Sequence, residues 1–266
     1  PWILAARPKT LFAALSPVVV GLAYSASAEF SLHSLTGLAT LLCALLMQVG
    51  TNYVNDYFDA QTGVDDEKRL GPLRAIHLNL ITVDQLKRGY RLVFALAFLI
   101  GLGLILRAGL PIAVIGISSL FLAYIYTAGP FPLSHYALGE LTAFIFFGPV
   151  AVWGTVYLQN PSPEILTSPL IWTLGAGQGF ISAAIMSINN LRDRENDKKK
   201  NKWTLAVLLS EKGGRILTLA FILHSGLWPL VLSSFFHSLW PLLATFITFL
   251  FFPNWKQIWS SAIGSS

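Results

Sequence analysis

Long apolar runs separated by shorter polar segments dominate the chain. A helix that crosses the bilayer core needs about 20 mostly apolar residues, because no water is present there to hydrogen-bond a bare backbone. Runs of this kind cover residues 11–28, 35–58, 90–107, 110–127, 138–158, 168–190, 214–234 and 236–253. The pattern therefore predicts an all-α, polytopic transmembrane helical bundle with eight spans.

The composition supports lipid as the solvent for this chain. Hydrophobic residues make up 54% of the sequence and charged residues only 12%, against about 25% charged residues in an ordinary soluble domain. So few charges cannot cover a soluble fold of this size. The net charge of +5 does not indicate a nucleic-acid surface, because the basic residues are clustered between the apolar runs.

The positions of the basic residues predict an orientation. With eight spans, every Lys and Arg except Arg107 falls on the same side of the membrane, and the side rich in Lys and Arg is normally the cytoplasm. Two long polar loops on that side, 59–89 and 191–213, are expected to contain the active site. We interpret residues 1–266 as one transmembrane domain, shortened at both ends, in the bacterial inner membrane.

One set of acidic and amide residues closes the second apolar run. It consists of Asn52, Asn55, Asp56, Asp59 and Asp65. Asn55 and Asp59 are four residues apart, so a helix would place both on one face. Acidic residues in or beside membrane spans are costly and usually functional.

A second set closes the sixth apolar run and contains Asn190, Asp193 and Asp197. Carboxylates at a helix C-terminus add to its partial negative charge and therefore need a cation. Hard oxygen ligands suit Mg²⁺, which leaves its other positions to water and phosphate. The alternative is that these are ordinary juxtamembrane charges. Their repetition on one predicted side favours two metal-binding sets around one polyanion.

Basic residues near both sets fit a phosphate ligand. They are Arg74, Arg192, Lys198 and Lys202. In a membrane this points to an allylic diphosphate, whose heterolysis a metal ion assists. The resulting allylic cation needs a dry cavity with aromatic faces. Tyr126, at the predicted cytoplasmic end of its span, is the leading aromatic candidate, although simple packing is the commoner role for such residues.

These residues resemble the UbiA superfamily of intramembrane prenyltransferases, and within it the 1,4-dihydroxy-2-naphthoate branch of menaquinone biosynthesis. The segments 7–11, 52–65, 71–74 and 189–207 carry the resemblance. It implies a ring of nine helices around a central cavity, of which the ninth has no counterpart among the apolar runs found here. It also implies Mg²⁺-dependent transfer of a polyprenyl group to 1,4-dihydroxy-2-naphthoate with decarboxylation, giving demethylmenaquinone and diphosphate.

The resemblance also implies roles for the residues above. Mg²⁺ ligands are expected at Asn55, Asp56, Asp59, Asp65, Asp193 and Asp197. Diphosphate contacts are expected from Asn52, Arg74, Asn190, Arg192, Lys198 and Lys202. Catalysis is assigned to Asn55, Asp59, Asp193 and Asp197, and to Tyr126 because of its position at the end of its span. The partners are a polyprenyl diphosphate, a small aromatic acid and the lipid bilayer, with no nucleic acid.

Departures and alternatives remain. Asn201 and Ser210 stand where the branch usually has Gly. Gly129 and Gly148 could leave room for a bicyclic acceptor, although glycines in membrane helices more often serve packing. A sister enzyme acting on 4-hydroxybenzoate or homogentisate is one alternative. A transporter is another, disfavoured because the charges gather at one face rather than at the midplane, and a non-catalytic assembly protein is a third.

Overall fold

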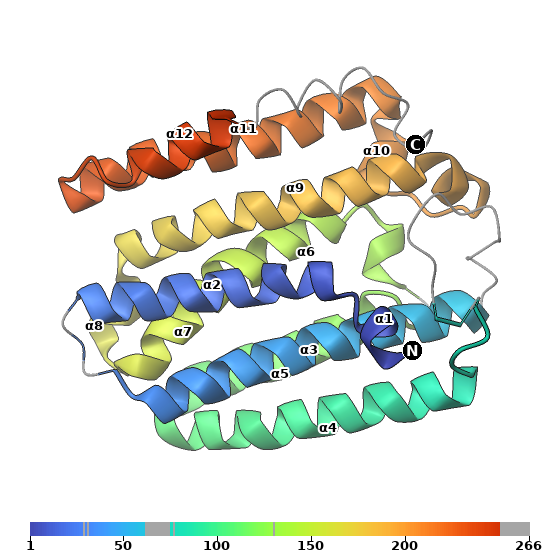
Figure 1. Cartoon of the computed structure of the whole chain (residues 1–266), viewed down its shortest axis with the longest axis horizontal. Coiled ribbons are helices and arrows are strands. Elements are labelled where there is room, and N and C mark those ends of the chain that lie inside the picture. The colour runs from blue at the N-terminus through green and yellow to red at the C-terminus, as the bar shows by residue number, and fades with distance from the viewer. Residues whose placement is uncertain (29, 31, 62–74, 77, 130, 251–266) are drawn as a thin grey trace. The chain divides into compact units, whose positions relative to one another are not determined.

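The computed structural model describes residues 1–28, 30, 32–61, 75–76, 78–129 and 131–250, and within them it is all-helical (Figure 1). The α-helices are α1 (Trp2–Ala6), α2 (Pro8–Ser27), α3 (Ser34–Gln61), α4 (Val83–Ala108), α5 (Leu110–Ile125), α6 (Gly139–Ile145), α7 (Ala151–Gln159), α8 (Pro163–Thr167), α9 (Pro169–Lys199), α10 (Leu205–Leu208), α11 (Ser210–Phe236) and α12 (Leu242–Leu250). A 3₁₀ helix, η1 (Leu133–His135), and a π-helical segment, η2 (Phe146–Val150), complete the elements. The predicted all-α fold class is confirmed.

Within the described residues, six helical segments are long and apolar enough to cross a membrane. They are α2, α3, α4, the segment Gly139–Gln159, α9 and α11. The predicted count of eight is not confirmed. The fourth predicted span corresponds to α5, which has only 16 residues, because it begins after a turn at Gly109 with φ 72° and ends before Gly129 with φ 85°.

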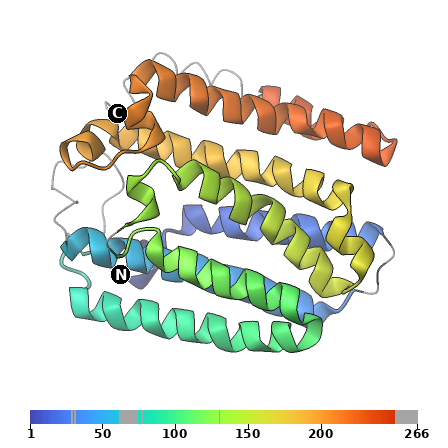
Figure 2. The same cartoon turned by 180° about the vertical axis from the view of Figure 1, so that it is seen from behind.

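The chain forms two compact units. The first contains Pro1–Leu133 and Val150–Ser168, and the second contains Ser134–Pro149 and the chain from Pro169 onward. In the first unit α3 packs against α4, and α2 packs against α7. In the second unit α9 packs against α6 and α11, as both views show (Figures 1 and 2).

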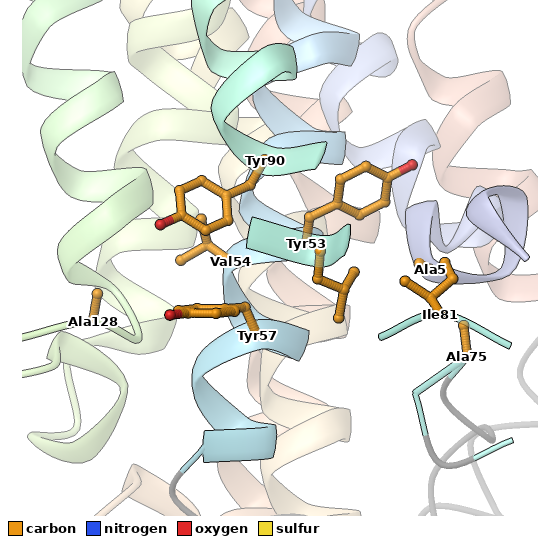
Figure 3. Close-up of a cluster of buried hydrophobic side chains, with 9 residues drawn as sticks. Ala5, Tyr53, Val54, Tyr57, Ala75, Ile81, Tyr90 and Ala128 are labelled. Carbon is orange, nitrogen blue, oxygen red and sulfur yellow. The ribbon is translucent and has the colours of Figure 1, made fainter. Parts of the chain in front are cut away.

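A buried cluster in the first unit joins α1 to α3 and α4 (Figure 3). It contains Ala5, Tyr53, Val54, Tyr57, Ala75, Ile81, Leu86, Tyr90 and Ala128. The rings of Tyr57 and Tyr90 lie 5.5 Å apart. Tyr53 also contacts the ring of Trp2 at 5.5 Å and donates a hydrogen bond to the Trp2 carbonyl. The short helix α1 is thereby fixed to the C-terminal half of α3, where the first acidic set lies.

Small residues bring α9 close to the segment after α6 in the second unit. A Cβ atom added to Gly148 would lie 2.5 Å from the Cα atom of Gly179, and one added to Gly175 would lie 2.5 Å from the Cα atom of Pro149. Such contacts leave space only for hydrogen. Gly148 is therefore a packing glycine, the alternative that the sequence left open, and it does not leave room for an acceptor.

Both predicted cytoplasmic loops are shorter than expected. Helix α4 begins at Val83, where Thr82 and Gln85 form a capping box, so part of the predicted loop 59–89 is helical. Helix α9 continues to Lys199 and α10 follows at Leu205. The second acidic set therefore lies within α9. The helix can continue through these polar residues because Asp193 and Asp197 form ion pairs with Arg192 and Lys202.

Candidate active site

Two members of the first acidic set hold the N-terminal segment. Asn52, 3% exposed, donates from Nδ2 to the Ala6 carbonyl at 2.8 Å and to Thr10 Oγ1 at 3.0 Å. Asp56, 1% exposed, accepts a hydrogen bond from Arg7. These contacts fasten α3 to the junction of α1 and α2; the roles of Asp56 as a metal ligand and of Asn52 as a diphosphate contact stay predictions.

Asn55 and Asp59 lie on the same helix as Asn52 and Asp56. Thr127 Oγ1 donates a hydrogen bond to Asn55 Oδ1, so the chain just after α5 lies beside the first acidic set. Tyr126 precedes Thr127, caps α5 and is half-buried. Asp59 is also half-buried, one helical turn beyond Asn55. The C-terminal end of α3 therefore carries Asn55 and Asp59, and the chain around Tyr126 lies beside it.

Two predicted site residues, Asp65 and Arg74, lie outside the described residues. The structure therefore tests neither the predicted third ligand of the first set nor its predicted phosphate contact.

The acids of the second set are paired with the basic residues that the sequence assigned to phosphate. Arg192 donates to Asp193 through Nε and Nη2, each at 2.8 Å. Lys202 Nζ lies 3.4 Å from Oδ1 of Asp197, which is only 3% exposed. The Lys202 amide also donates to the Asp197 carbonyl at 2.9 Å. Lys198 lies exposed at the end of α9.

Sequence reasoning missed one buried acid in the second unit. Glu140, in the first turn of α6, is 2% exposed. Its Oε1 accepts a hydrogen bond of 2.9 Å from Nδ2 of Asn190. A lone acid in an apolar run is itself a signal of function, but Glu140 does not share the four-residue spacing of the other acids. The contact extends the second acidic set from α9 onto α6.

The donor chemistry of the two sets fits Mg²⁺ that arrives with a diphosphate. The described residues contain no group of three or more His, Cys, Asp or Glu side chains that could hold a metal ion by itself. Mg²⁺ does not need such a group, because it is usually held by one or two carboxylates with water and substrate phosphate in its other positions. Asn55 with Asp59, and Asp193 with Asp197, each supply hard oxygen donors at helical spacing.

Residues 14–265 of the chain match the UbiA prenyltransferase family. The chain belongs to the UbiA prenyltransferase family. It is 39% identical over 224 residues to a 1,4-dihydroxy-2-naphthoate octaprenyltransferase of Haemophilus influenzae, covering 81% of this chain and 71% of that protein. It is 34% identical over 247 residues to the Escherichia coli protein of the same name, covering 90% of this chain and 78% of that protein.

The fold of this UbiA family member also matches solved structures. A UbiA homologue from Archaeoglobus fulgidus bound to GPP and Mg²⁺ superposes with a TM-score of 0.71 at 14% identity, over 100% of this chain and 90% of that one. The identification confirms the family predicted from the sequence. The protein is an integral membrane enzyme that transfers a prenyl group to an aromatic acceptor, which excludes the transporter and the non-catalytic assembly protein.

Proposed function

We propose that this enzyme transfers a polyprenyl group from a polyprenyl diphosphate to 1,4-dihydroxy-2-naphthoate. The products are diphosphate, CO₂ and a demethylmenaquinone. We choose this acceptor because the sequence is 39% and 34% identical to two octaprenyltransferases named for this naphthoate. The acidic pairs on α3 and α9 support the choice of donor, because they present oxygen ligands suited to Mg²⁺ and phosphate.

In this proposal five residues are the oxygen ligands of Mg²⁺. They are Asn55, Asp59, Asp65, Asp193 and Asp197. Mg²⁺, when bound, neutralises the negative charge that develops on the departing diphosphate. We leave Asp56 out of this set because its ion pair with Arg7 joins α3 to the junction of α1 and α2. The basic partners of Asp193 and Asp197 are instead themselves proposed to contact phosphate.

The ion pairs of the second set give the ligand a way to bind without leaving a charge unpaired. Arg192 neutralises Asp193 and Lys202 neutralises Asp197 before the ligand arrives. A ligand that carries both a cation and phosphate offers each partner a new counter-charge. The carboxylates turn to the cation, and Arg192 and Lys202 turn to phosphate oxygens, as do Arg74 and Lys198. Because an uncompensated buried charge is strongly unfavourable, this exchange requires metal and diphosphate together.

Tyr126 is proposed to face the allylic end of the donor. The bond between the allylic carbon and the diphosphate oxygen breaks, and its electron pair leaves with the diphosphate. An aromatic ring face stabilises the allylic cation that remains, and apolar surroundings keep water from it. The acceptor carbon that bears the carboxylate attacks the cation. Loss of CO₂ then returns the bonding electron pair to the ring and restores aromaticity.

We also propose the orientation that the charge pattern predicts. The ends of α3 and α9 that carry the acidic sets would face the cytoplasm, in a bacterial inner membrane. Both substrates would then enter from that side, the isoprenoid through lipid and the aromatic acid from water.

The test is a single incubation of the purified protein with Mg²⁺, a polyprenyl diphosphate and a panel of aromatic acids, followed by product mass. We expect 1,4-dihydroxy-2-naphthoate to be prenylated with the loss of CO₂, and 4-hydroxybenzoate to be a poor acceptor. A product that retains its carboxyl group, or preferred turnover of 4-hydroxybenzoate, would move the enzyme to a sister branch of the family. It would leave the diphosphate chemistry intact.

A further inference from the structure

Glu140 carries one buried carboxylate oxygen that accepts no hydrogen bond from the part of the chain that the structure describes. Its Oε1 accepts from Asn190, whereas Oε2 has no hydrogen-bond partner among the described residues. The residue is 2% exposed. Leaving a buried acceptor unsatisfied costs about 1–3 kcal/mol, so a retained one calls for a specific role.

The carboxylate of Glu140 has a cationic neighbour. The ammonium group of Lys202 interacts electrostatically with the Glu140 carboxylate, and it also lies 3.4 Å from Asp197 Oδ1. Lys202 therefore interacts with two carboxylates, that of Glu140 on α6 and that of Asp197 on α9. It forms its ion pair with Asp197.

The backbone keeps Lys202 near Glu140. Trp203, the next residue, donates its amide hydrogen to the His135 carbonyl at 3.1 Å and forms an isolated bridge with Tyr136. His135 and Tyr136 precede α6, which begins one residue before Glu140. The segment that carries Lys202 is thus fastened to the segment that leads into Glu140.

We propose that Glu140 is a positioning residue that holds Asn190 with one carboxylate oxygen and offers the other to Lys202. With this second partner, Lys202 can release Asp197 to the cation of the ligand and remain in place for a phosphate oxygen. This inference rests on the proposed function, in which Asp197 binds Mg²⁺ and Lys202 binds diphosphate.

The charges explain why a second partner is needed. Without Glu140, the departure of Asp197 would leave the largely buried Lys202 ammonium without a counter-charge until phosphate reached it, and such a charge is costly. Lys202 would then compete with Mg²⁺ for Asp197. Loss of the Glu140 charge should therefore weaken binding of the metal and of the diphosphate together.

Glu140→Gln separates the two contacts of the residue. The glutamine keeps an oxygen for Asn190 and replaces the oxygen offered to Lys202 with an amide NH₂ group. We expect binding of inorganic diphosphate in the presence of Mg²⁺ to weaken about tenfold. Binding is measured on the whole chain in detergent, by the shift in thermal unfolding as Mg²⁺ and diphosphate are titrated. Glu164→Gln is the matched control, because Glu164 is also the second residue of its helix, α8, but is exposed.

The route through Lys202 is tested in a double variant. If Glu140 acts through Lys202, the effect of Glu140→Gln on binding disappears in a Lys202→Met background. Additive effects would overturn the inference, as would parent-like binding by Glu140→Gln. Glu140→Asp, which keeps the charge but shortens the side chain, gives a second measurement should the glutamine variant not fold, and we expect it to weaken binding; parent-like binding would again overturn the inference.

The assay does not use the aromatic acceptor, so its outcome is separable from that of the proposed function. Failure of the parent to prenylate the naphthoate, with normal binding of Mg²⁺ and diphosphate, would reject the proposed acceptor and leave the role of Glu140 standing. Normal turnover by the parent, with unchanged diphosphate binding by Glu140→Gln, would reject the role of Glu140 alone.

Discussion

Arg7 donates a hydrogen bond to the buried carboxylate of Asp56, 49 residues further along the chain. Arg7 has a left-handed backbone, with φ 51°, at the junction of α1 and α2. Asn52, one helical turn before Asp56, binds the carbonyl of Ala6. The junction is therefore fastened to α3 at two positions, which alternate along the helix with Asn55 and Asp59.

Asp56→Asn should destabilise the protein without changing its need for metal. The change removes a charge-assisted hydrogen bond between the buried Asp56 and the partly exposed Arg7, and such a bond contributes about 1.5–3 kcal/mol. We expect a lower midpoint of thermal unfolding in detergent and an unchanged Mg²⁺ concentration for half-maximal turnover. Arg7→Met with Asp56→Leu removes both charges and should lose less stability than the two single changes added together. A shifted Mg²⁺ requirement at unchanged stability would instead make Asp56 a metal ligand.

Asp59→Asn and Asp193→Asn should each abolish most turnover and leave the fold intact. Each change removes one oxygen ligand of the ion that neutralises the leaving group. The loss of one such electrostatic contact costs about 10²–10³ in rate. The measurement is prenyl transfer at saturating donor, with thermal unfolding as the check on folding.

Asp84→Asn, which changes an exposed acid in the first turn of α4, is the control. Turnover within about threefold of the parent in either variant would remove that residue from the site.

The fold class and the two acidic sets could be predicted because both depend on local patterns. Apolar runs long enough to span lipid require helices, and acids four residues apart on a helix share a face. The Asn and Asp residues of α3 all fall within one such pattern, so their spacing could not separate Asp56 from Asp59. Only the Arg7 contact, made across two helices, does so.

The lengths of helices and the partners of lone residues could not be predicted. Helix α9 continues to Lys199 although its last turns are polar, because Asp193 and Asp197 are neutralised by basic residues close in the chain. The position of Glu140 in an apolar run marks it as unusual, but its contact with Asn190 could be seen only in the structure. A contact between residues 50 positions apart leaves no trace in local periodicity.

The ends of α3 and α9 that bear the acids should be reached by reagents only from the cytoplasm. The reason is that the basic residues gather beside them. After Cys43→Ala removes the native thiol, Gln61→Cys and Asn201→Cys are treated with a maleimide that does not cross membranes. We expect no labelling in intact cells and full labelling after permeabilisation. Labelling of either position in intact cells would reverse the orientation.

Ser210→Gly should stabilise the protein and leave its activity unchanged. Ser210 has φ 67° at the start of α11, a conformation that costs an ordinary residue about 1–2 kcal/mol and a glycine almost nothing. Glycine is more flexible in the unfolded chain, which offsets part of this gain. We therefore expect the free energy of unfolding to rise by about 1 kcal/mol and the unfolding midpoint to rise by about 2–4 °C.

The matched control is Ser234→Gly, at an exposed position within α11. This change should lower the free energy of unfolding by about 0.5 kcal/mol, because glycine disfavours a helix interior. A lower midpoint for Ser210→Gly would mean that its side chain stabilises the start of α11 by more than the backbone strain costs.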